Sequence, residues 1–343
     1  NIPFDNQYTR YAFTKVNFDF IGMRKKMYIA SGILIFIGII SLATKGLNFG
    51  VDFSGGRTYV IRFDKEVGTN EVRSLLAEEF GEAPEVKTFG GANQVKITTK
   101  YMIEEDTQAA DSIVEAKIYN GVKGLYDTPM SFNDFTADDE AKVLGRLSSQ
   151  KVGPTIADDI KQGAVLAVFF ALLIIFIYIA IRFKKWQYGI GGLISLAHDT
   201  MITISLYSIF SGILPFNLEV DQAFIAALLT IIGYSINDTV IIFDRIREYI
   251  GLYPKRAITD NMNHAMNSTL GRTFNTAGTT LVVLIAIFIF GGEVIRGFVF
   301  ALMVGIAVGT YSSIFIASPI AFDFITNSAK RRKRKEEAKK LQK

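Results

Sequence analysis

Residues 223–243 read AFIAALLTIIGYSINDTVIIF, an apolar run that holds one carboxylate, Asp238, well inside it. A helix needs roughly 20 residues to cross a hydrocarbon core about 30 Å thick, and this run has that length. An ionisable group deep in such a helix costs roughly 2.5–3.5 kcal/mol on insertion scales, and by default it marks a path for ions or protons. The run therefore indicates a membrane-spanning helix with a functional acid.

Polar residues gather on the face of this helix that carries Asp238. They lie three, four and eight positions before it, at helical spacing: Ser235, Tyr234 and Thr230. Asn237 stands beside the acid and can hydrogen-bond across a helix contact. The alternative is a carboxylate near a helix end within reach of water, which describes Asp244 next to Arg245. For Asp238 the functional interpretation is favoured.

Five further segments are apolar and long enough to span a membrane, which makes six spans in total. They are residues 27–45, 164–181, 188–210, 277–290 and 298–322. Half of the 343 residues are apolar, which places the chain with membrane proteins. With no cysteine and only two histidines, the chain has few of the side chains that metal centres and nucleophilic catalysis require. We expect no enzyme activity, no metal and no cofactor.

Basic residues collect on one side of the six predicted spans. The clusters lie at 24–26, 182–185, 245–272 and 330–335. By the positive-inside rule this side is cytoplasmic, which predicts cytoplasmic segments at 1–26 and 327–343. The C-terminal cluster is interpreted as a topology anchor that touches anionic lipid. Because the charges follow the spans, they indicate membrane orientation rather than nucleic-acid binding.

The segment 46–161, on the other side of the membrane, is the only one long enough for a separate folded domain. Strands are predicted at 58–63, 85–89 and 94–99, and helices at 69–80 and 104–119. The first of these helices is expected to have Thr69 or Asn70 as its cap and to stop at Gly81. This order is typical of a small α+β domain of the split βαβ, ferredoxin-like type. Residues 120–150 are polar and aperiodic, and no structure is predicted for them.

A second polar stripe opens the span 277–290. Its members follow the helical spacing i, i+3, i+4, i+7 and i+8: Arg272, Asn275, Thr276, Thr279 and Thr280. Arginine stays charged at any relevant pH, so Arg272 cannot carry a proton but can hold a nearby carboxylate ionised. The alternative is an arginine that reaches to the headgroups, and the long stripe favours pairing or proton coupling over it.

Two further spans carry features with less specific meaning. His198 and Asp199 in span 188–210 can relay protons, or they can be a buried pair that fixes helix packing, and the sequence leaves both open. Span 298–322 has small residues at every fourth position, which indicates a seam for close helix packing. The seam consists of Ala301, Gly305, Gly309, Ser313 and Ala317.

Several strings of this sequence, taken together and in order, resemble those of one family. They are FGVDFSGG (49–56), VGP (152–154), AHD (197–199), IGYSINDT (232–239) and RT (272–273). They resemble the SecF subunits of the SecD/SecF protein-export complex, which belong to the resistance-nodulation-division superfamily of proton-driven transporters. The similarity extends over about residues 17–329.

The resemblance implies a role for particular residues. It makes Asp238 and Arg272 the pair associated with proton passage, and it places Asp52, Gly55 and Gly56 at the root of a small periplasmic domain. His198 and Asp199 match a family motif whose chemical role stays open. The resemblance also implies a location in the bacterial inner membrane and a part in late-stage translocation of preproteins into the periplasm.

The partners implied by the resemblance are a SecD subunit or SecD-like half, a SecYEG-type channel and an unfolded preprotein. Since the first residue is Asn1 rather than methionine, we expect a processed product or a piece of something longer, such as the rear half of a SecD–SecF fusion. Two other functions stay open. One is a resistance-nodulation-division exporter of small molecules or lipids, and the other is a non-conducting scaffold of the export channel.

Overall fold

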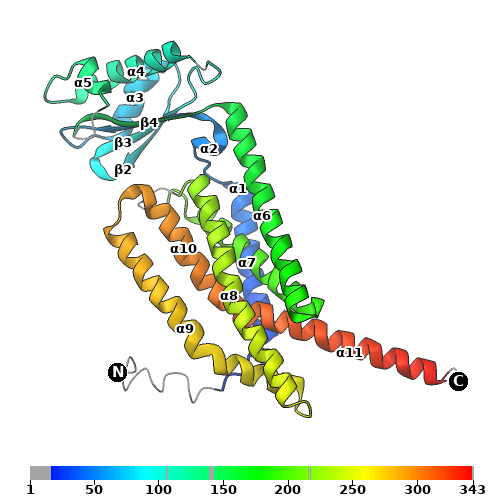
Figure 1. Ribbon diagram of the computed structural model, residues 1–343. Helices are drawn as coiled ribbons and strands as arrows, with labels where there is room; N and C mark the ends of the chain where they lie inside the picture. Colours follow the sequence, from blue (N-terminus) through cyan, green and yellow to red (C-terminus); the bar gives the residue numbers. More distant parts are fainter. Residues whose placement is uncertain (1–16, 106, 139–142, 215, 217, 342–343) are drawn as a thin grey trace, which may run out of the picture.

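The computed structural model describes residues 17–341 except 106, 139–142, 215 and 217. It shows a bundle of long helices with a small α/β domain at one end (Figure 1). Six helices in the described residues are long and apolar enough to cross a membrane, which confirms the predicted number. They are α1 (Phe20–Thr44), α6 (Pro154–Phe183), α7 (Trp186–Phe210), α8 (Gln222–Leu252), α9 (Ile258–Phe290), and a sixth formed by α10 (Glu293–Ser312), the π-helical turn η2 (Ser313–Ala317) and α11 (Ser318–Leu341).

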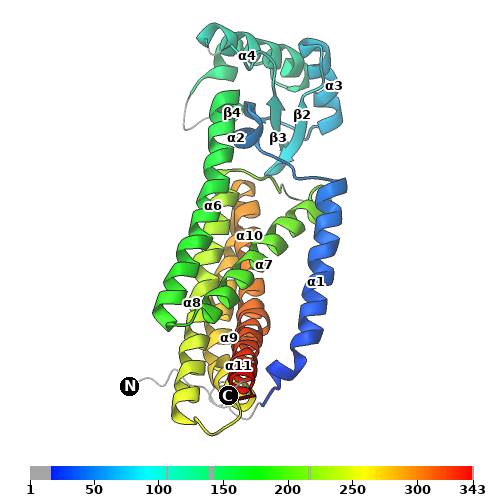
Figure 2. The ribbon, with the colours of Figure 1, turned by 90° about the vertical axis from the view of Figure 1, so that its right-hand side faces the viewer.

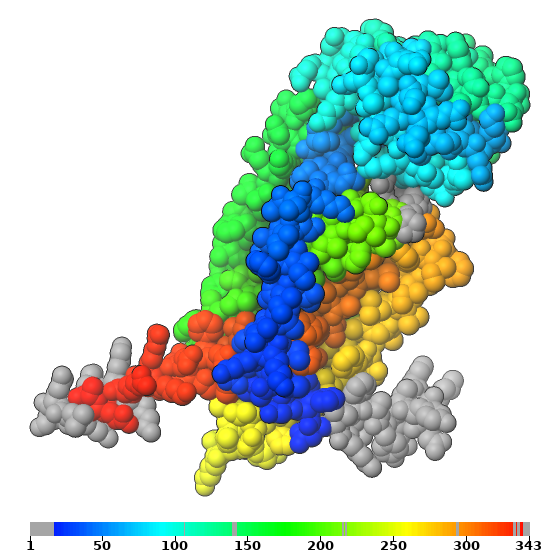
Figure 3. All heavy atoms as spheres, turned by 180° about the vertical axis from the view of Figure 1, so that it is seen from behind, coloured from blue at the N-terminus to red at the C-terminus, as the bar shows by residue number. Residues whose placement is uncertain are grey.

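The helices divide into an inner and an outer set. The inner set is α7, α8 and α10, and about half of the most apolar stretch of each inner span is buried by other helices. The outer set is α1, α6 and α9, whose apolar side chains are mostly exposed and so face lipid or another chain. In Figure 2, α1 and α6 flank α7, and Figure 3 shows α1 along the outside of the bundle with α11 projecting from the far end.

Most of the spans are parts of helices longer than the apolar runs that predicted them. Helix α9 begins at Ile258, well before the predicted span 277–290, so the polar residues from Arg272 to Thr276 stand within the helix. The predicted tail 327–343 continues α11 in helical form as far as Leu341. Hydropathy marks where a helix is apolar, whereas the helix itself extends wherever backbone hydrogen bonds and compatible residues continue.

The α/β domain has four strands and two long helices in the order predicted for a ferredoxin-like fold. Its elements are β1 (Gly56–Arg62), α3 (Thr69–Phe80), β2 (Glu85–Phe89), β3 (Gly91–Thr99), α4 (Gln108–Val122) and β4 (Gly145–Val152), with the short helices α2 (Val51–Ser54), η1 (Lys123–Leu125) and α5 (Phe132–Thr136). The sheet order is β2-β3-β1-β4, and all neighbouring strands are antiparallel. The split βαβ prediction is confirmed.

Three details of the domain differ from the prediction. Residues 120–150, left without structure, hold α5 and most of β4; the strand was missed because it lies at the sheet edge with an exposed polar middle. Helix α4 begins at Gln108 rather than 104, since the Thr107 side chain caps it by accepting from the Ala110 N–H at 3.2 Å. Helix α3 has Gly68 as its N-cap, not Thr69 or Asn70, and ends at Gly81 as expected.

The boundary between domain and bundle also differs from the predicted residue 161. Strand β4 ends at Val152, and Pro154 is the first residue of α6, a position that suits proline because its missing N–H is unpaired there in any helix. Helix α6 then runs unbroken to Phe183 (Figure 2). The domain is therefore joined to the bundle by a rigid helix on this side.

The two faces of the sheet have different neighbours. Side chains alternate along a strand, so Tyr59, Ile61 and Ile97 point to one face, where they pack against α3 and α4. On the opposite face, Thr58 and Lys96 line a cavity of about 250 Å³ whose other walls come from the bundle. This second face of the sheet therefore looks onto the bundle.

The small-residue seam of the sixth span brings α10 against α8. A Cβ atom at Gly305 would lie 2.2 Å from both Cγ1 and Cδ1 of Ile231, which is 1% exposed and β-branched. We expect Gly305→Ala to lower the free energy of unfolding by about 1–3 kcal/mol because the core is overpacked. Gly233→Ala on α8 is the control, since its Cβ would have nothing within 4 Å. Equal unfolding midpoints for the two variants in detergent would contradict this packing.

Candidate functional site

Asp238 lies in the middle of α8, where Asp221 caps the helix start by accepting from the Phe224 N–H at 2.8 Å. The Asp238 side chain is 2% exposed, and its Oδ2 atom is buried without a hydrogen bond from any described residue. A buried carboxylate oxygen without a donor is costly, so such groups in native structures call for a functional explanation. The predicted acid is therefore inside the bundle and not at a wetted helix end.

Arg272 stands on the neighbouring helix α9 but does not touch Asp238. Two contacts fix the antiparallel register of α8 and α9, namely Tyr234 Oη to Thr280 Oγ1 at 3.4 Å and Arg245 Nε to Ser268 Oγ at 3.1 Å. In this register Asp238 is level with Asn275, one turn from Arg272. The Arg272 side chain is exposed and makes no ion pair within the described chain, yet it is near enough to act on Asp238 through its charge.

The first part of the polar stripe of α9 is exposed, whereas Thr280 farther along meets Tyr234 of α8. Asn237 of α8 and Asn275 of α9 are exposed like Arg272, and none of the three side chains has a hydrogen-bond partner among the described residues. We call these three residues the outward polar face. The threonines differ, because Thr276, Thr279 and Thr280 donate to the carbonyls four residues before them in the helix and are thereby satisfied. The threonine hydroxyls therefore need no further hydrogen-bond partner, whereas the side chains of the outward polar face do.

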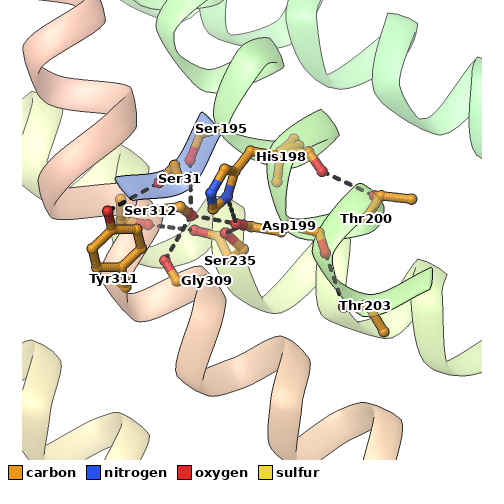
Figure 4. A network of polar contacts seen from close by, with 12 residues as sticks. Ser31, Ser195, His198, Asp199, Thr200, Thr203, Ser235, Gly309, Tyr311 and Ser312 are labelled. Carbon is orange, nitrogen blue, oxygen red and sulfur yellow. Dashed lines mark hydrogen bonds and ion pairs between the residues drawn. The ribbon is translucent and has the colours of Figure 1, made fainter. Parts of the chain in front are cut away.

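Asp199 is the centre of a buried hydrogen-bond network between α7, α8 and α10 (Figure 4). Its Oδ2 atom accepts from Ser235 Oγ at 2.7 Å and from Ser312 Oγ at 2.8 Å, and its Oδ1 atom lies 3.0 Å from His198 Nδ1. Ser195 Oγ in turn donates to Ser312 Oγ at 2.9 Å. These five residues form the Asp199 network, and Asp199 itself has no exposed surface.

His198 ends the network on the side of α1. Its Nδ1 atom pairs with Asp199, while its Nε2 atom is buried without a partner in the described chain. The ring lies 6.1 Å from that of Tyr311, whose hydroxyl meets Ser31 Oγ of α1 at 3.0 Å. In the structure His198 and Asp199 do form a pair. The hydrogen bonds of Asp199 to α8 and α10 connect these helices to α7, which suits a role in helix packing.

The network and Asp238 share helix α8 without a hydrogen bond between them. Ser235 is one turn from Asp238, but its hydroxyl is directed to Asp199. Thr239, next to Asp238, pairs instead with Ser313 Oγ of the π-helical turn at 2.8 Å. Such turns occur often at functional sites, where they shift the register of a helix. The described part of the bundle therefore contains two separate buried carboxylates. Asp199 has hydrogen-bond partners for both of its oxygens, whereas Oδ2 of Asp238 has none.

Sequence reasoning missed Ser312 and Tyr311. Both belong to the run GTYSS at 309–313, which stands out as polar within an otherwise apolar span. Of this run, only Gly309 and Ser313 belong to the small-residue seam that the sequence predicts. The seam interpretation holds as well, since a Cβ at Gly309 would lie 2.9 Å from Ser235 Cβ and 3.5 Å from Asp199 Oδ2. A polar run within a span is the signal that would have revealed these residues.

The root motif joins the α/β domain to the start of α8. Asp52 in α2 accepts from the Gln222 N–H at 3.1 Å through one carboxylate oxygen, and from Gln150 Nε2 of β4 at 3.0 Å through the other. Gly55 has a φ of +66° and Gly56 a φ of +148°, conformations that favour glycine. A side chain at Gly56 would also press on Val51 Cγ1 at 3.2 Å. The glycines thus allow the chain to turn sharply from α2 into β1.

No group of three or more histidine, aspartate or glutamate side chains in the described residues is placed to hold a metal ion. The expectation that the protein works without a metal or cofactor stays a prediction.

Comparison with known proteins identifies the family. Protein translocase subunit SecF of Rhodothermus marinus is 42% identical over 321 residues, which cover 94% of this chain and 97% of the relative. The chain belongs to the SecF family. The SecF subunit of Haemophilus influenzae is 36% identical over 305 residues, covering 89% of this chain and 85% of that protein. Both proteins are named as translocase subunits.

Two family models match parts of the chain that contain the candidate site residues. Residues 135–327 match the model described as protein export membrane protein SecD/SecF, C-terminal, and residues 40–67 match the SecD/SecF GG motif. The first match contains Asp199, Asp238 and Arg272. The second contains Asp52 and both glycines of the root motif.

Solved structures of SecDF share the fold. A crystal structure of SecDF from Thermus thermophilus, described as a translocon-associated membrane protein, superposes with a TM-score of 0.74 at 30% identity over 91% of this chain. A second SecDF structure, in a super-membrane-facing form, matches at 29% identity with a TM-score of 0.62 over 95% of this chain. The present chain spans only 39% of the length of the first SecDF chain and 40% of the second.

Proposed function

We propose that this SecF-family chain couples proton passage across the bacterial inner membrane to a late stage of preprotein export. The observation that carries the proposal is the buried Oδ2 atom of Asp238, which lacks a donor in the middle of a membrane-spanning helix. A proton arriving at this carboxylate removes the cost of the buried charge, so the site is suited to cyclic protonation.

A second chain completes the proton path in this proposal. The outward polar face, with Asn237, Arg272 and Asn275, has no partner in the described chain, and polar groups at this depth usually meet other protein or water. The SecDF chains, of which this chain spans about two fifths, contain additional protein. We infer that a SecD-like half covers the outward polar face and contributes a further carboxylate to the path.

Arg272 responds to the charge of Asp238 in this mechanism. It attracts the ionised carboxylate and loses that attraction when Asp238 is protonated, so that α8 and α9 shift against one another. One charge crossing 100 mV gains about 2.3 kcal/mol, which biases a two-state rearrangement roughly fiftyfold. Apart from the O–H bond that forms and breaks as Asp238 takes up and releases the proton, no covalent bond changes in this step, so the chain acts as a transport component rather than an enzyme.

The orientation in the proposal follows the positive-inside rule. The far end of the bundle carries the exposed arginines Arg182 and Arg247 and the basic helix α11, and these charges support a cytoplasmic location for this end, near anionic lipid. The α/β domain is then periplasmic. There it holds and releases the unfolded preprotein as it emerges from a SecYEG-type channel.

Reconstitution tests the coupling. The chain, a SecD subunit and the channel with its ATPase are placed in vesicles, and export of a secreted precursor is followed after ATP is exhausted. Continued export that stops when an ionophore collapses the proton gradient is the expected result. Export that ends with the ATP, gradient or no gradient, would assign a scaffold role. Gradient-driven movement of a small molecule or lipid without precursor export would assign an exporter.

A further inference from the structure

Two lysines stand directly opposite each other on the face of the sheet that looks onto the bundle. Lys87 of β2 and Lys96 of β3 are register partners in the antiparallel ladder. Like charges in this position repel one another and destabilise a sheet. Glu85 of β2 lies 2.6 Å from Lys87 Nζ and offsets part of this repulsion, but no ion pair within the described residues of the domain reaches Lys96, which still needs an anion.

Glu219 supplies that anion from the bundle. Its Oε2 atom lies 2.6 Å from Lys96 Nζ and its Oε1 atom 3.3 Å from Lys87 Nζ, and only 10% of its side chain is exposed. Burial raises the pKa of Glu219, but the two lysines outweigh it and hold that pKa below its ordinary value. We call Glu219, Lys87 and Lys96 the lysine clamp. Removing Glu219 from these partly buried pairs leaves two uncompensated ammonium groups next to each other.

The lysine clamp contacts the chain at Glu219, directly before the helix that carries Asp238. Glu219 precedes Asp221, the N-cap of α8, and Val220 between them donates to Asn48 O at 2.8 Å and accepts from Gly50 N–H at 3.0 Å. Asp52 accepts from Gln222 N–H within the first turn of α8. The start of α8 is thus fixed to the α/β domain by side chains of the sheet and by the root motif.

Helix α8 is unbroken from Gln222 to Leu252, so it moves as one rod. Asp238 lies sixteen residues from Gln222, roughly 24 Å along the helix at 1.5 Å per residue. A displacement of α8 at Asp238 therefore reaches Glu219 with little loss. The covalent links through α2 and α6 tether the domain, while the clamp connects it to the helix that senses the proton.

We propose that the lysine clamp is the joint through which movement of α8 is passed to the α/β domain. The direction of the transmitted force rests on the proposed function, whereas the rigid attachment of the domain to α8 does not. Glu219 is a positioning residue in this scheme. If the contact only held the domain in place, removing it would not change gradient-dependent export.

Distance measurements test the attachment. The sequence has no cysteine, so spin labels can be placed on cysteines introduced at exposed Ser112 of α4 and Ala226 of α8, in the chain reconstituted with its SecD partner. We expect one narrow distance distribution in the wild type and a broad one in Glu219→Gln. Glu85→Gln is the matched control, because Glu85 contacts Lys87 at 2.6 Å within the domain itself and should leave the distribution narrow. An unchanged distribution in Glu219→Gln overturns the proposal.

Export measurements test the transmission. Asp238→Asn should shift the distribution in the wild-type background but not in Glu219→Gln, and Glu219→Gln should lose most of the gradient-dependent export. Reversing the charges of all three clamp residues, Glu219→Lys with Lys87→Glu and Lys96→Glu, in the Glu85→Gln background that spares the glutamate introduced at position 87 a like charge, should restore both readouts, which excludes a folding defect. Full gradient-dependent export in Glu219→Gln overturns the joint. If even the wild type lacks gradient-dependent export, the proposed function is wrong. The distance distributions then still test whether Glu219 attaches the α/β domain to α8.

Discussion

Asp238→Asn should reduce export of a secreted precursor to the level measured after the proton gradient is collapsed. Asparagine has nearly the shape of aspartate but cannot take up and release a proton at relevant pH. The ATP-driven part of export and the association with the SecD partner should be unchanged. The unfolding midpoint should stay the same or rise, since an uncompensated buried charge is removed. Export of a labelled precursor, with and without ionophore, is the measurement.

Asp244→Asn is the matched control for this variant. Asp244 lies on the same helix, but its side chain is 37% exposed and pairs with Arg182 at 3.0 Å. Exposed pairs of this kind contribute about 0–1 kcal/mol, so the control should export nearly as well as the wild type. Gradient-dependent export that persists in Asp238→Asn would refute the coupling mechanism. Equal losses in both variants would attribute the defect to a general effect of removing a negative charge from α8.

The sequence predicted what depends on local pattern. The six spans follow from apolar runs of sufficient length, and the burial of Asp238 follows from its place within such a run. The order of strands and helices in the α/β domain was also readable, because β1 and β3 have regular alternation. Edge strand β4 has polar, exposed residues at 148–150 and lacks that signal.

Other features depend on which elements meet, and one sequence does not contain that information. Helical spacing shows that Arg272 and Asn275 share a face of α9, but not that both side chains are exposed. Likewise, the polar run 309–313 marks Ser312 but not its partner Asp199, and nothing in the sequence places two lysines around Glu219. The direction of a helix face and the partners of a loop are tertiary properties.

Asp199→Leu should destabilise the bundle more than any other substitution within the Asp199 network. It removes the acceptor of Ser235, Ser312 and His198 at once and leaves their polar atoms buried. Polar contacts between membrane helices average about 0.6 kcal/mol each, and an unsatisfied buried group costs about 1–3 kcal/mol. We expect a loss of about 2–5 kcal/mol in the free energy of unfolding.

Fluorescence of Trp186, the only tryptophan, can follow this unfolding. It begins α7, and its ring lies 5.6 Å from that of Phe324 in α11, so its emission reports the packing of the sixth span on α7. Asp199→Asn is the informative companion, because the amide keeps one oxygen to accept a serine hydroxyl. No hydrogen bond connects the network to Asp238 in the described chain, so we expect Asp199→Asn to fold and to retain gradient-dependent export. A folded Asp199→Asn variant without such export would instead make His198 and Asp199 a proton relay, because the substitution would then have removed a proton carrier and not a packing contact.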